Sequence, residues 1–489
     1  MLPVAVGIPA LGGLGVLVFG RRPNVRDGIS LLAGIAVAAV VLSLWWLPES
    51  VQPEFGFWTW LPQLSLGLRL EPLGLLFATI SAVLWPITTL YTIGYLRGNA
   101  ESNQTRFGFF FALSIAAAQL IAFSGDLVTL FLGYELLTLA TYALVAHSGT
   151  SRARRGARTY LSLLLLTSIG FLLPAIVATG LLAGSLRFPA TASDGALLAG
   201  QASAGVLTGL YVLYLFGIGK AALMPFHRWL PAAMVAPTPV SALLHAVAVV
   251  KAGVFAVLKV TVYVFGVDQL SAEGLSTPMM WVAAITLLAA SLYAMTRDDF
   301  KARLAYSTVS QLAYIVLAAT LASNLAVVGG ALHIAAHAVG KITLFFCAGV
   351  VYTVAHRERV SELDGLGRAM PWTFTAFTVA AVSVIGLPPL GGSWSKWLLY
   401  QGAADAQQTV LLVVLMVGSV LTAGYLLPIT VRAFFRMPAQ PIEHRDGGFA
   451  LVFPPVLTAA ATIALFFGAE ALIAPLAEAV GVSSEVGSG

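Results

Sequence analysis

Apolar runs of roughly 20 residues recur from one end of the chain to the other, separated by short polar stretches. A helix needs about 20 apolar residues to cross the ~30 Å hydrocarbon core of a membrane. The pattern therefore predicts an all-α polytopic membrane protein with about fourteen transmembrane helices. The predicted spans are residues 2–20, 29–47, 72–95, 107–123, 127–147, 159–183, 204–235, 238–265, 279–296, 302–322, 325–353, 371–400, 408–434 and 450–475.

The basic residues support this count, because Lys and Arg gather in loops on the cytoplasmic side of a membrane. With the amino terminus placed outside, nineteen of the 26 Lys and Arg residues fall in inner loops. Only Arg69 and Arg187 fall in outer loops, and the other five lie within spans. Arg21 and Arg22 follow the first apolar run, which is therefore expected to be a helix and not a signal peptide. We expect a multi-pass protein of the bacterial cell (inner) membrane with both termini on the outer side.

Composition excludes several classes of protein. Hydrophobic residues make up 59% of the 489 residues and charged residues only 10%, whereas soluble domains average about 25% charged residues. The net charge of +5 comes from short inter-helix loops, so we expect no nucleic-acid partner. The single cysteine, Cys347, excludes disulfides and iron–sulfur clusters and is expected to be a small apolar residue in a helix.

Residues 53–70 alternate aromatic and polar positions and predict a surface hairpin on the outer face.

Five lysines fall inside predicted spans, where each costs about 2.5–3.5 kcal/mol on insertion scales. Lys259 lies late in its span and is expected to extend its ammonium group to the outer interface. The other four need a functional reason, and they are Lys220, Lys251, Lys341 and Lys396.

Two of these lysines lie beside predicted breaks in helices. Lys220 lies in LFGIGKAALMPFHRWLP and Lys396 in SVIGLPPLGGSWSKWLLY, where Gly and Pro interrupt the helical pattern. Broken helices at membrane depth are tolerated only where they line a cavity or are buried in protein, and transporters use them at binding sites.

The spacing of the two breaks predicts an internal repeat. The broken spans are the seventh and the twelfth, and a repeated unit of five helices must insert with opposite topology because five is odd. The chain is therefore expected to contain two inverted five-helix repeats. The predicted divisions are an amino-terminal three-helix segment at 1–106, a first repeat at 107–265, a second repeat at 279–434 and a carboxy-terminal helix and tail at 450–489.

Glu135 is a carboxylate well inside a predicted span, and Lys220 of the same predicted repeat is its expected partner. Such a pair tunes the lysine pKa, since moving the carboxylate away favours release of the lysine proton. The alternative is a carboxyl group that is hydrogen-bonded only for packing.

Titratable side chains also line one predicted helix. His333, His337 and Lys341 are spaced i, i+4 and i+8, which places them on one helix face. HxxxH can bind zinc, but the glutamate of HExxH is absent and Lys341 would repel a metal, so a proton relay is favoured and no metal or cofactor is expected. His245 and Lys251 share another span, where His245 bridges Lys220 and Lys251 through water or, alternatively, forms an interhelical hydrogen bond.

Four segments resemble the proton-translocating antiporter-like subunits of respiratory complex I, membrane-bound hydrogenases and multisubunit cation/proton antiporters. They are GKAALMPFHRWLPAAMVAPTPVSALLHAVAVVKAGVFAVLK, DDFKARLAYSTVSQLAYIVLA, LHIAAHAVGKITLFFCAG and VSELDGLGRAMPWTFTAFTVAAVSVIGLPPLGG. The resemblance implies that Glu135 and Lys220 form the ion pair of a first half-channel and that Lys396 is the terminal lysine. It implies that His245 and Lys251 connect the two halves. Within this family, a lysine at 396 in place of glutamate speaks against the middle complex I homologue. Two segments look most like the D-type subunit of the multisubunit sodium/proton antiporter, YELLTLATYALVAHSGT and VSELDGLGRAMPW.

The expected function is the translocation of protons through a buried Glu/Lys/His relay, with sodium/proton translocation as a variant of the same function. The expected partners are the lipid bilayer and other membrane subunits of a hetero-oligomeric complex. The alternative is a proton-pumping membrane-arm subunit of a complex I-like or hydrogenase complex. A carrier for an organic solute, a non-transporting assembly subunit and a redox enzyme are the weaker rivals, and no redox or hydrolytic site is predicted in this chain.

Overall fold

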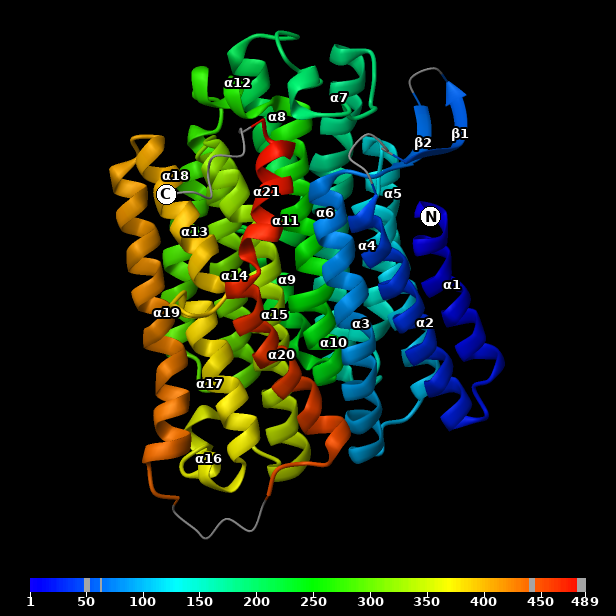
Figure 1. The fold of residues 1–489 in the computed structure, drawn as a ribbon, viewed down its shortest axis with the longest axis vertical. Helices are drawn as coiled ribbons and strands as arrows, with labels where there is room; N and C mark the ends of the chain where they lie inside the picture. The colour runs from blue at the N-terminus through cyan, green and yellow to red at the C-terminus, as the bar shows by residue number, and fades with distance from the viewer. Residues whose placement is uncertain (48–52, 62–63, 439–444, 482–489) are drawn as a thin grey trace.

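The computed structural model describes residues 1–47, 53–61, 64–438 and 445–481, and its helices form a bundle along one common direction (Figure 1). Ten helical segments of this described part are long and apolar enough to cross a membrane. Three further apolar helices, α1, α8 and α17, are shorter. The prediction of an all-α polytopic membrane protein is confirmed, whereas the number of fourteen crossings and the division into repeats stay predictions.

The helices lie close to the predicted spans. The first part contains α1 (Leu2–Val18), α2 (Pro23–Ser43), α3 (Pro72–Gly98), α4 (Gln104–Ala122), α5 (Leu127–Val145), α6 (Ser151–Thr167), η2 (Ser168–Leu172), α7 (Leu173–Ala183) and α8 (Ala204–Gly217). The middle contains η4 (Gly219–Ala221), η5 (Phe226–Arg228), α9 (Trp229–Ala232), η6 (Ala233–Val235), α10 (Thr238–Ala242), η7 (Leu243–Val247), α11 (Val249–Lys259), η8 (Val260–Phe265) and α12 (Val267–Ala272). The last part contains α13 (Thr277–Thr296), α14 (Phe300–Thr320), α15 (Asn324–Ala355), α16 (Leu366–Ala369), α17 (Pro371–Ile385), α18 (Gly392–Asp405), α19 (Thr409–Phe435), α20 (Phe449–Phe467) and α21 (Ala469–Ala479).

Local sequence sets several helix starts. Pro72 occupies the first position of α3, where the missing amide is not needed. Asp126 caps α5 by accepting a hydrogen bond from the Thr129 amide at 2.7 Å, and Asp299 caps α14 in the same way through Ala302 at 2.7 Å. These caps position the ends of two helices that carry or contact the candidate site.

Two segments form the centre of the bundle. The continuous segment from α10 through η8 is fully buried along its most apolar stretch, and α15 is 94% buried there. α15 packs against α14, α17, α18 and α20 on one side and against α10, η7 and α11 on the other. Most of the titratable residues predicted from the sequence lie on these two central segments and are buried there, namely His245, Lys251, His333, His337 and Lys341.

Both predicted breaks are confirmed. α8 ends at Gly217 and is followed by short 3₁₀ turns, and Ala222 has a φ of 55° in the left-handed region. α17 ends at Ile385, and Gly386 has a φ of 97° before the chain re-enters a helix at α18. Such a φ favours glycine, which accounts for Gly386 at the second break.

The predicted surface hairpin is also confirmed. β1 (Glu54–Leu61) pairs antiparallel with β2 (Leu64–Arg69) at the upper end of the bundle (Figure 1). Glu54 forms an ion pair with Arg69 at 2.6 Å and a second one with Arg187. Partial burial alone would raise the pKa of Glu54, but hydrogen bonds from Arg187 and Arg69 outweigh it and hold the pKa below its usual value. The hairpin is thus tied to the loop after α7.

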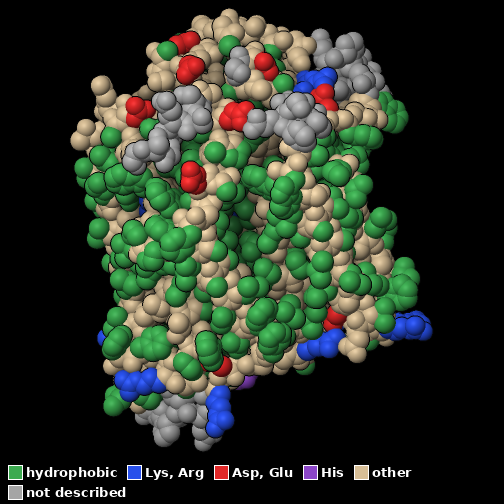
Figure 2. Space-filling view, viewed as in Figure 1, with side chains coloured by type: hydrophobic (Ala, Val, Ile, Leu, Met, Phe, Trp, Pro, Cys, Tyr) green, Lys and Arg blue, Asp and Glu red, His purple; other side chains and the backbone are tan. Residues whose placement is uncertain are grey.

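Charge is distributed unevenly between the two ends of the bundle. Most Lys and Arg side chains visible in Figure 2 lie at the lower end, and most Asp and Glu side chains lie at the upper end. The wall between them is largely hydrophobic, as a lipid-facing or subunit-facing surface requires. Below, the lower end is called the basic face.

Candidate functional site

Lys220 lies in the break after α8 and is fully buried. Its Nζ donates to the Tyr134 carbonyl at 2.8 Å and to Thr138 Oγ1 at 2.6 Å, and its backbone amide donates to the Tyr134 hydroxyl at 2.9 Å. The ammonium group also lies 3.1 Å from the centroid of the Tyr134 ring. α11 packs directly on this break because Gly253 has no side chain, and a Cβ there would collide with the Lys220 backbone. One face of α5 and the break together hold the lysine.

Glu135 adjoins the α5 residues that bind the Lys220 ammonium group, but it forms no direct ion pair with Lys220 among the described residues. One of its carboxylate oxygens, Oε1, is buried without a hydrogen-bond partner. The carbonyl and hydroxyl groups one turn apart on α5 bind the ammonium group in place of the carboxylate, and the functional pairing of Glu135 with Lys220 stays a prediction. The Glu135 carboxylate still lies close enough to attract the ammonium group electrostatically.

Lys251 and His337 are in direct contact through Nζ and Nδ1. Lys251 lies on α11 and His337 on α15, so this contact joins the two predicted repeats. The other ring nitrogen of His337, Nε2, is buried without a partner. The His337 ring lies 5.8 Å from the His333 ring with the planes 17° apart, which confirms that both project from one face of α15.

His333 connects the histidine pair to neighbouring helices. Its Nδ1 lies 2.8 Å from Ser395 Oγ on α18, and its Nε2 lies 3.2 Å from Gln311 Oε1 on α14. The ring therefore exchanges hydrogen bonds with two other helices while it stacks on His337. Within the described residues, no three His, Cys, Asp or Glu side chains gather closely enough to hold a metal ion.

Lys341 is joined to the same network through α14 and α19. Its Nζ donates to Ser307 Oγ at 2.6 Å, and Ser307 donates to the Tyr425 hydroxyl at 3.0 Å. The Tyr425 hydroxyl donates to Thr422 Oγ1 at 3.1 Å, and Gln311 Nε2 donates to the same Thr422 oxygen at 3.2 Å. Because Gln311 also contacts His333, hydrogen bonds run without a gap from Lys341 to the histidine pair.

Lys396 occupies the second break. Its Nζ donates to the Ile385 carbonyl and to Ser419 Oγ, each at 2.9 Å, and lies 4.6 Å from the centroid of the Tyr314 ring. A Cβ at Gly386 would lie only 2.6 Å from the Lys396 side chain, so glycine makes room for the lysine as well as for the turn. Lys396 directly follows Ser395, the partner of His333, so the second break lies beside the histidine pair of α15.

His245 lies in η7 and is fully buried. Its ring packs 4.7 Å from the Phe345 ring of α15, and both ring nitrogens are without hydrogen-bond partners among the described residues. The charges that act on it come from Lys341, Lys301 and Lys251. η7 turns the imidazole toward α15, and the water-mediated bridge from His245 to Lys220 and Lys251 stays a prediction.

Lys259 corrects another expectation. It does not reach the interface but is buried, and its Nζ forms an ion pair with Glu71 at 2.6 Å. The same Nζ donates to the Ser124 carbonyl at 2.6 Å. Glu71 directly precedes α3 and is 4% exposed, so the start of α3 provides the missing counter-charge.

Sequence reasoning missed the hydroxyl and amide groups that link the titratable side chains. The signal was present, since Ser307 and Gln311 are spaced i, i+4 on α14, and Ser419 and Thr422 are spaced i, i+3 on α19. Polar positions at helical spacing within apolar helices indicate one polar face. The structure places the α14 face against the polar face of α15, and the α19 face against α14 and α18.

Comparison with known proteins is consistent with this geometry. Residues 124–422 match the profile of the NADH:quinone oxidoreductase/Mrp antiporter transmembrane family. The chain is 34% identical over 390 residues to the N-type subunit of the NADH-quinone oxidoreductase of Desulforudis audaxviator, covering 78% of this chain and 75% of that protein. It is 26% identical over 480 residues to the D-type subunit of the Na⁺/H⁺ antiporter of Alkalihalophilus pseudofirmus, covering 96% of this chain and 94% of that protein.

The fold also matches a solved structure. A chain of the Mrp complex from Dietzia sp. superposes with a TM-score of 0.83 over 98% of this chain and 96% of that chain, at 22% sequence identity. At this identity the match supports the fold alone. It agrees with the arrangement of helices described above.

Proposed function

Because this chain belongs to the NADH:quinone oxidoreductase/Mrp antiporter transmembrane family, we propose that it translocates protons as an antiporter-like subunit of a multisubunit cation/proton antiporter. The observation that carries the proposal is the contact between Lys251 and His337. It joins buried titratable groups of the two halves at the centre of the bundle. A charged group at such a depth marks an ion or proton pathway by default.

The proposed path has two arms that meet at this contact. In the first arm, Glu135 attracts a proton toward Lys220, and the proton then reaches Lys251. In the second arm, the proton passes from His337 to His333 and then through Ser395 to Lys396. Histidine suits such transfer because its ring has one nitrogen to accept a proton and another to release one. Water completes the steps that no direct hydrogen bond covers.

Lys341 forms a branch that meets the second arm at His333 through Gln311. The branch gives the relay a fourth buried lysine, so that a proton on one lysine disfavours a proton on its neighbours. Because protonated lysines repel one another, a proton that arrives on one lysine favours release of the proton on the next, and protons move stepwise. We include His245 in the relay because two of its lysines, Lys341 and Lys251, lie close enough to act on it electrostatically.

The proposal extends to location and partners. The relatives named above are subunits of larger complexes, which supports other membrane subunits as partners of this chain. The basic face supports an orientation in the bacterial cell membrane with that face toward the cytoplasm. The described chain begins with α1 and ends with α21 in the upper half of the bundle, which supports the proposal that both termini face outward (Figure 1).

The test uses everted membrane vesicles from cells that express the complete complex. We expect Lys220→Ala, Glu135→Ala and Lys396→Ala to abolish sodium-induced dissipation of the pH gradient while the complex still assembles. The assembled amount is measured by co-purification of the partner subunits. Wild-type exchange in assembled complexes of the Lys220→Ala or Glu135→Ala variant would refute the proposal.

The 34% identity to a quinone oxidoreductase subunit favours a second candidate, a proton-pumping membrane-arm subunit of a redox complex. In that case the same vesicles would form a pH gradient only when a reductant is supplied, and added sodium would leave the gradient unchanged. The two candidates share the relay and differ in what drives it.

A further inference from the structure

Basic and aromatic side chains gather on the side of the bundle where the segment after α8 meets α13 and α14. The His227 ring lies 6.3 Å from the Tyr306 ring, and the Arg297 guanidinium lies 5.5 Å from the centroid of the same ring. Tyr293 stacks on Tyr306 with the ring centroids 5.6 Å apart, and Arg228 directly follows His227. These five residues are called the lateral cluster below.

The lateral cluster has no counter-charge among the described residues. Arg228 and Arg297 are exposed, and neither forms an ion pair in that part of the chain. Asp298 directly follows Arg297, but its carboxylate accepts hydrogen bonds from the Ser361 amide at 2.9 Å and the Ser361 hydroxyl at 2.7 Å. The Asp299 carboxylate caps α14. The cluster therefore keeps a net positive charge, which suits an anion.

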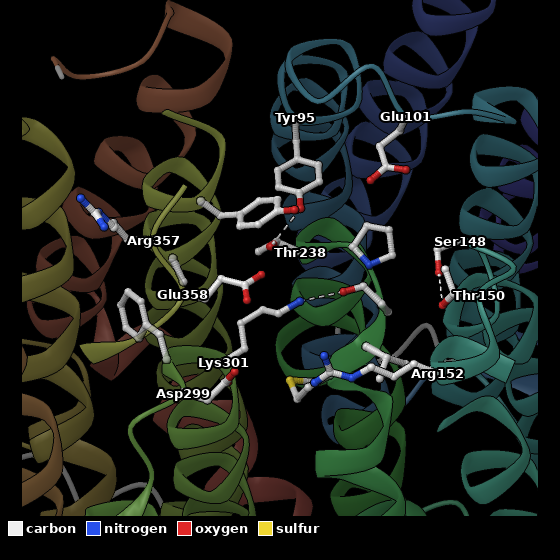
Figure 3. A pocket seen from close by; sticks show the side chains of 17 residues that line it. Tyr95, Glu101, Ser148, Thr150, Arg152, Thr238, Asp299, Lys301, Arg357 and Glu358 are labelled. Carbon is white, nitrogen blue, oxygen red and sulfur yellow. Dashed lines mark hydrogen bonds between the residues drawn. The ribbon is translucent and has the colours of Figure 1, made fainter. Parts of the chain in front are cut away.

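A cavity of about 230 Å³ at the basic face differs in this respect. Its walls carry three basic and three acidic side chains, which Figure 3 shows around the opening: Arg152, Lys301, Arg357, Glu101, Asp299 and Glu358. Because these charges balance, that cavity does not favour an anion. The lateral cluster lies on the outside of the bundle and has an excess of one sign.

An exposed apolar stripe on α13 leads to the lateral cluster. Trp281, Ile285 and Leu292 are 44%, 62% and 55% exposed and recur at helical spacing. α14 and α19 pack against the other side of α13. At 1.5 Å per residue, the stripe from Trp281 to Leu292 is about 16 Å long, which is close to half of the ~30 Å hydrocarbon core. The stripe thus matches the depth of one leaflet.

The cluster lies near the depth of lipid headgroups. Arg297 follows the last residue of α13, and Tyr306 comes six residues after the start of α14, or about 9 Å along it. The headgroup layers add about 5–8 Å to each side of the hydrocarbon core. Long basic side chains at such positions extend their charged ends toward the headgroups.

We propose that the lateral cluster binds the phosphate of an anionic phospholipid of the cytoplasmic leaflet, with an acyl chain along the α13 stripe. Arg228 and Arg297 bind the phosphate, because a guanidinium group matches phosphate with two parallel hydrogen bonds. The His227 ring and the tyrosine hydroxyl groups supply further donors. The lipid thereby joins the broken segment to α13. This site does not depend on proton translocation, so it stands apart from the proposed function.

Photo-crosslinking tests the site in the complete complex. The complex is reconstituted in phosphatidylcholine vesicles that contain a small fraction of phosphatidylglycerol with a diazirine in its acyl chain. A second preparation carries the same diazirine on phosphatidylcholine, and labelled peptides are identified by mass spectrometry. Each basic group near the membrane surface favours anionic lipid about fivefold, so two arginines should give about 25-fold more labelling of α13 by the anionic probe.

Matched variants separate this site from the general attraction of the basic face. Arg228→Gln and Arg297→Gln are each expected to lower the preference for the anionic probe about fivefold. Arg228→Lys and Arg297→Lys keep the charge and are expected to keep most of the preference. Arg22→Gln is the control, since Arg22 is exposed in the loop between α1 and α2 and its loss removes the same charge elsewhere. It is expected to leave labelling of α13 unchanged.

Three results would overturn the proposal. One is an equal loss of preference in the Arg22→Gln variant, which would show only a diffuse attraction to the basic face. Another is an unchanged preference when Arg228→Gln and Arg297→Gln are combined. The third is failure of both probes to label α13, which would mean that a partner subunit covers this face. Only complexes that retain their partner subunits are scored, so misfolded variants do not enter the comparison.

Discussion

The buried ion pair between Lys259 and Glu71 gives a quantitative prediction about stability. The Lys259 and Glu71 side chains are 1% and 3% exposed, and Nζ and Oε1 are 2.6 Å apart. Removing one partner leaves a buried charge without compensation, which costs about 3–5 kcal/mol. Replacing both by apolar residues of similar size is often neutral. We therefore expect Lys259→Met to cost about 3–5 kcal/mol, and Lys259→Met combined with Glu71→Leu to lie within about 1 kcal/mol of the parent.

The assay is a titration of the detergent-solubilised protein with a denaturing detergent, followed by tryptophan fluorescence. The matched control is the ion pair between Arg97 and Asp27, which has the same 2.6 Å distance but involves an arginine that is 45% exposed. Because exposed pairs contribute about 0–1 kcal/mol, Arg97→Gln is expected to change stability by less than about 1 kcal/mol. If Lys259→Met and the double variant are equally stable, the two charges do not compensate each other and the reasoning fails.

Three further predictions concern the relay, the hairpin and the first break. Ser307→Ala removes a hydrogen bond to the charged Lys341, worth about 1.5–3 kcal/mol, and should slow the initial rate of proton exchange at least about tenfold, with Ser307→Thr restoring it. The lowered pKa of Glu54 stabilises the hairpin fully above the ordinary glutamate value of 4.5, and this contribution is lost as the pH falls through the folded-state pKa, so hydrogen exchange of the hairpin amides should accelerate only in acid below that point. Gly253→Ala should cost about 1–3 kcal/mol by overpacking and lower the amount of assembled complex, whereas Gly205→Ala, in open space, should leave it unchanged.

Much of the fold could be predicted because membrane helices depend on local sequence. The length of the apolar runs determined the predicted spans, and Gly and Pro marked both breaks. At the second break Gly386 has a φ of 97°, which glycine adopts readily whatever packs around it. The hairpin followed from its alternating pattern, and its strands are observed at Glu54–Leu61 and Leu64–Arg69. These features require no knowledge of what packs against what.

The site was predictable only in part, because its partners are set by tertiary packing. Glu71 lies just before a predicted span and was not singled out from the sequence, yet the end of α11 brings Lys259 against it. Lys220 was assigned to Glu135 because opposite charges attract, but a carbonyl on α5 is the nearer ligand. A backbone carbonyl carries no sequence signal, so no pattern could have identified it.

The most direct test of the account is proton exchange by complexes altered at the contact between Lys251 and His337. Lys251→Met and His337→Phe keep the size of each side chain and remove its ability to carry a proton. In everted vesicles with fully assembled complexes, the account predicts that each variant, and the two combined, lose exchange completely and to the same extent. Exchange at the wild-type rate in either single variant would contradict it.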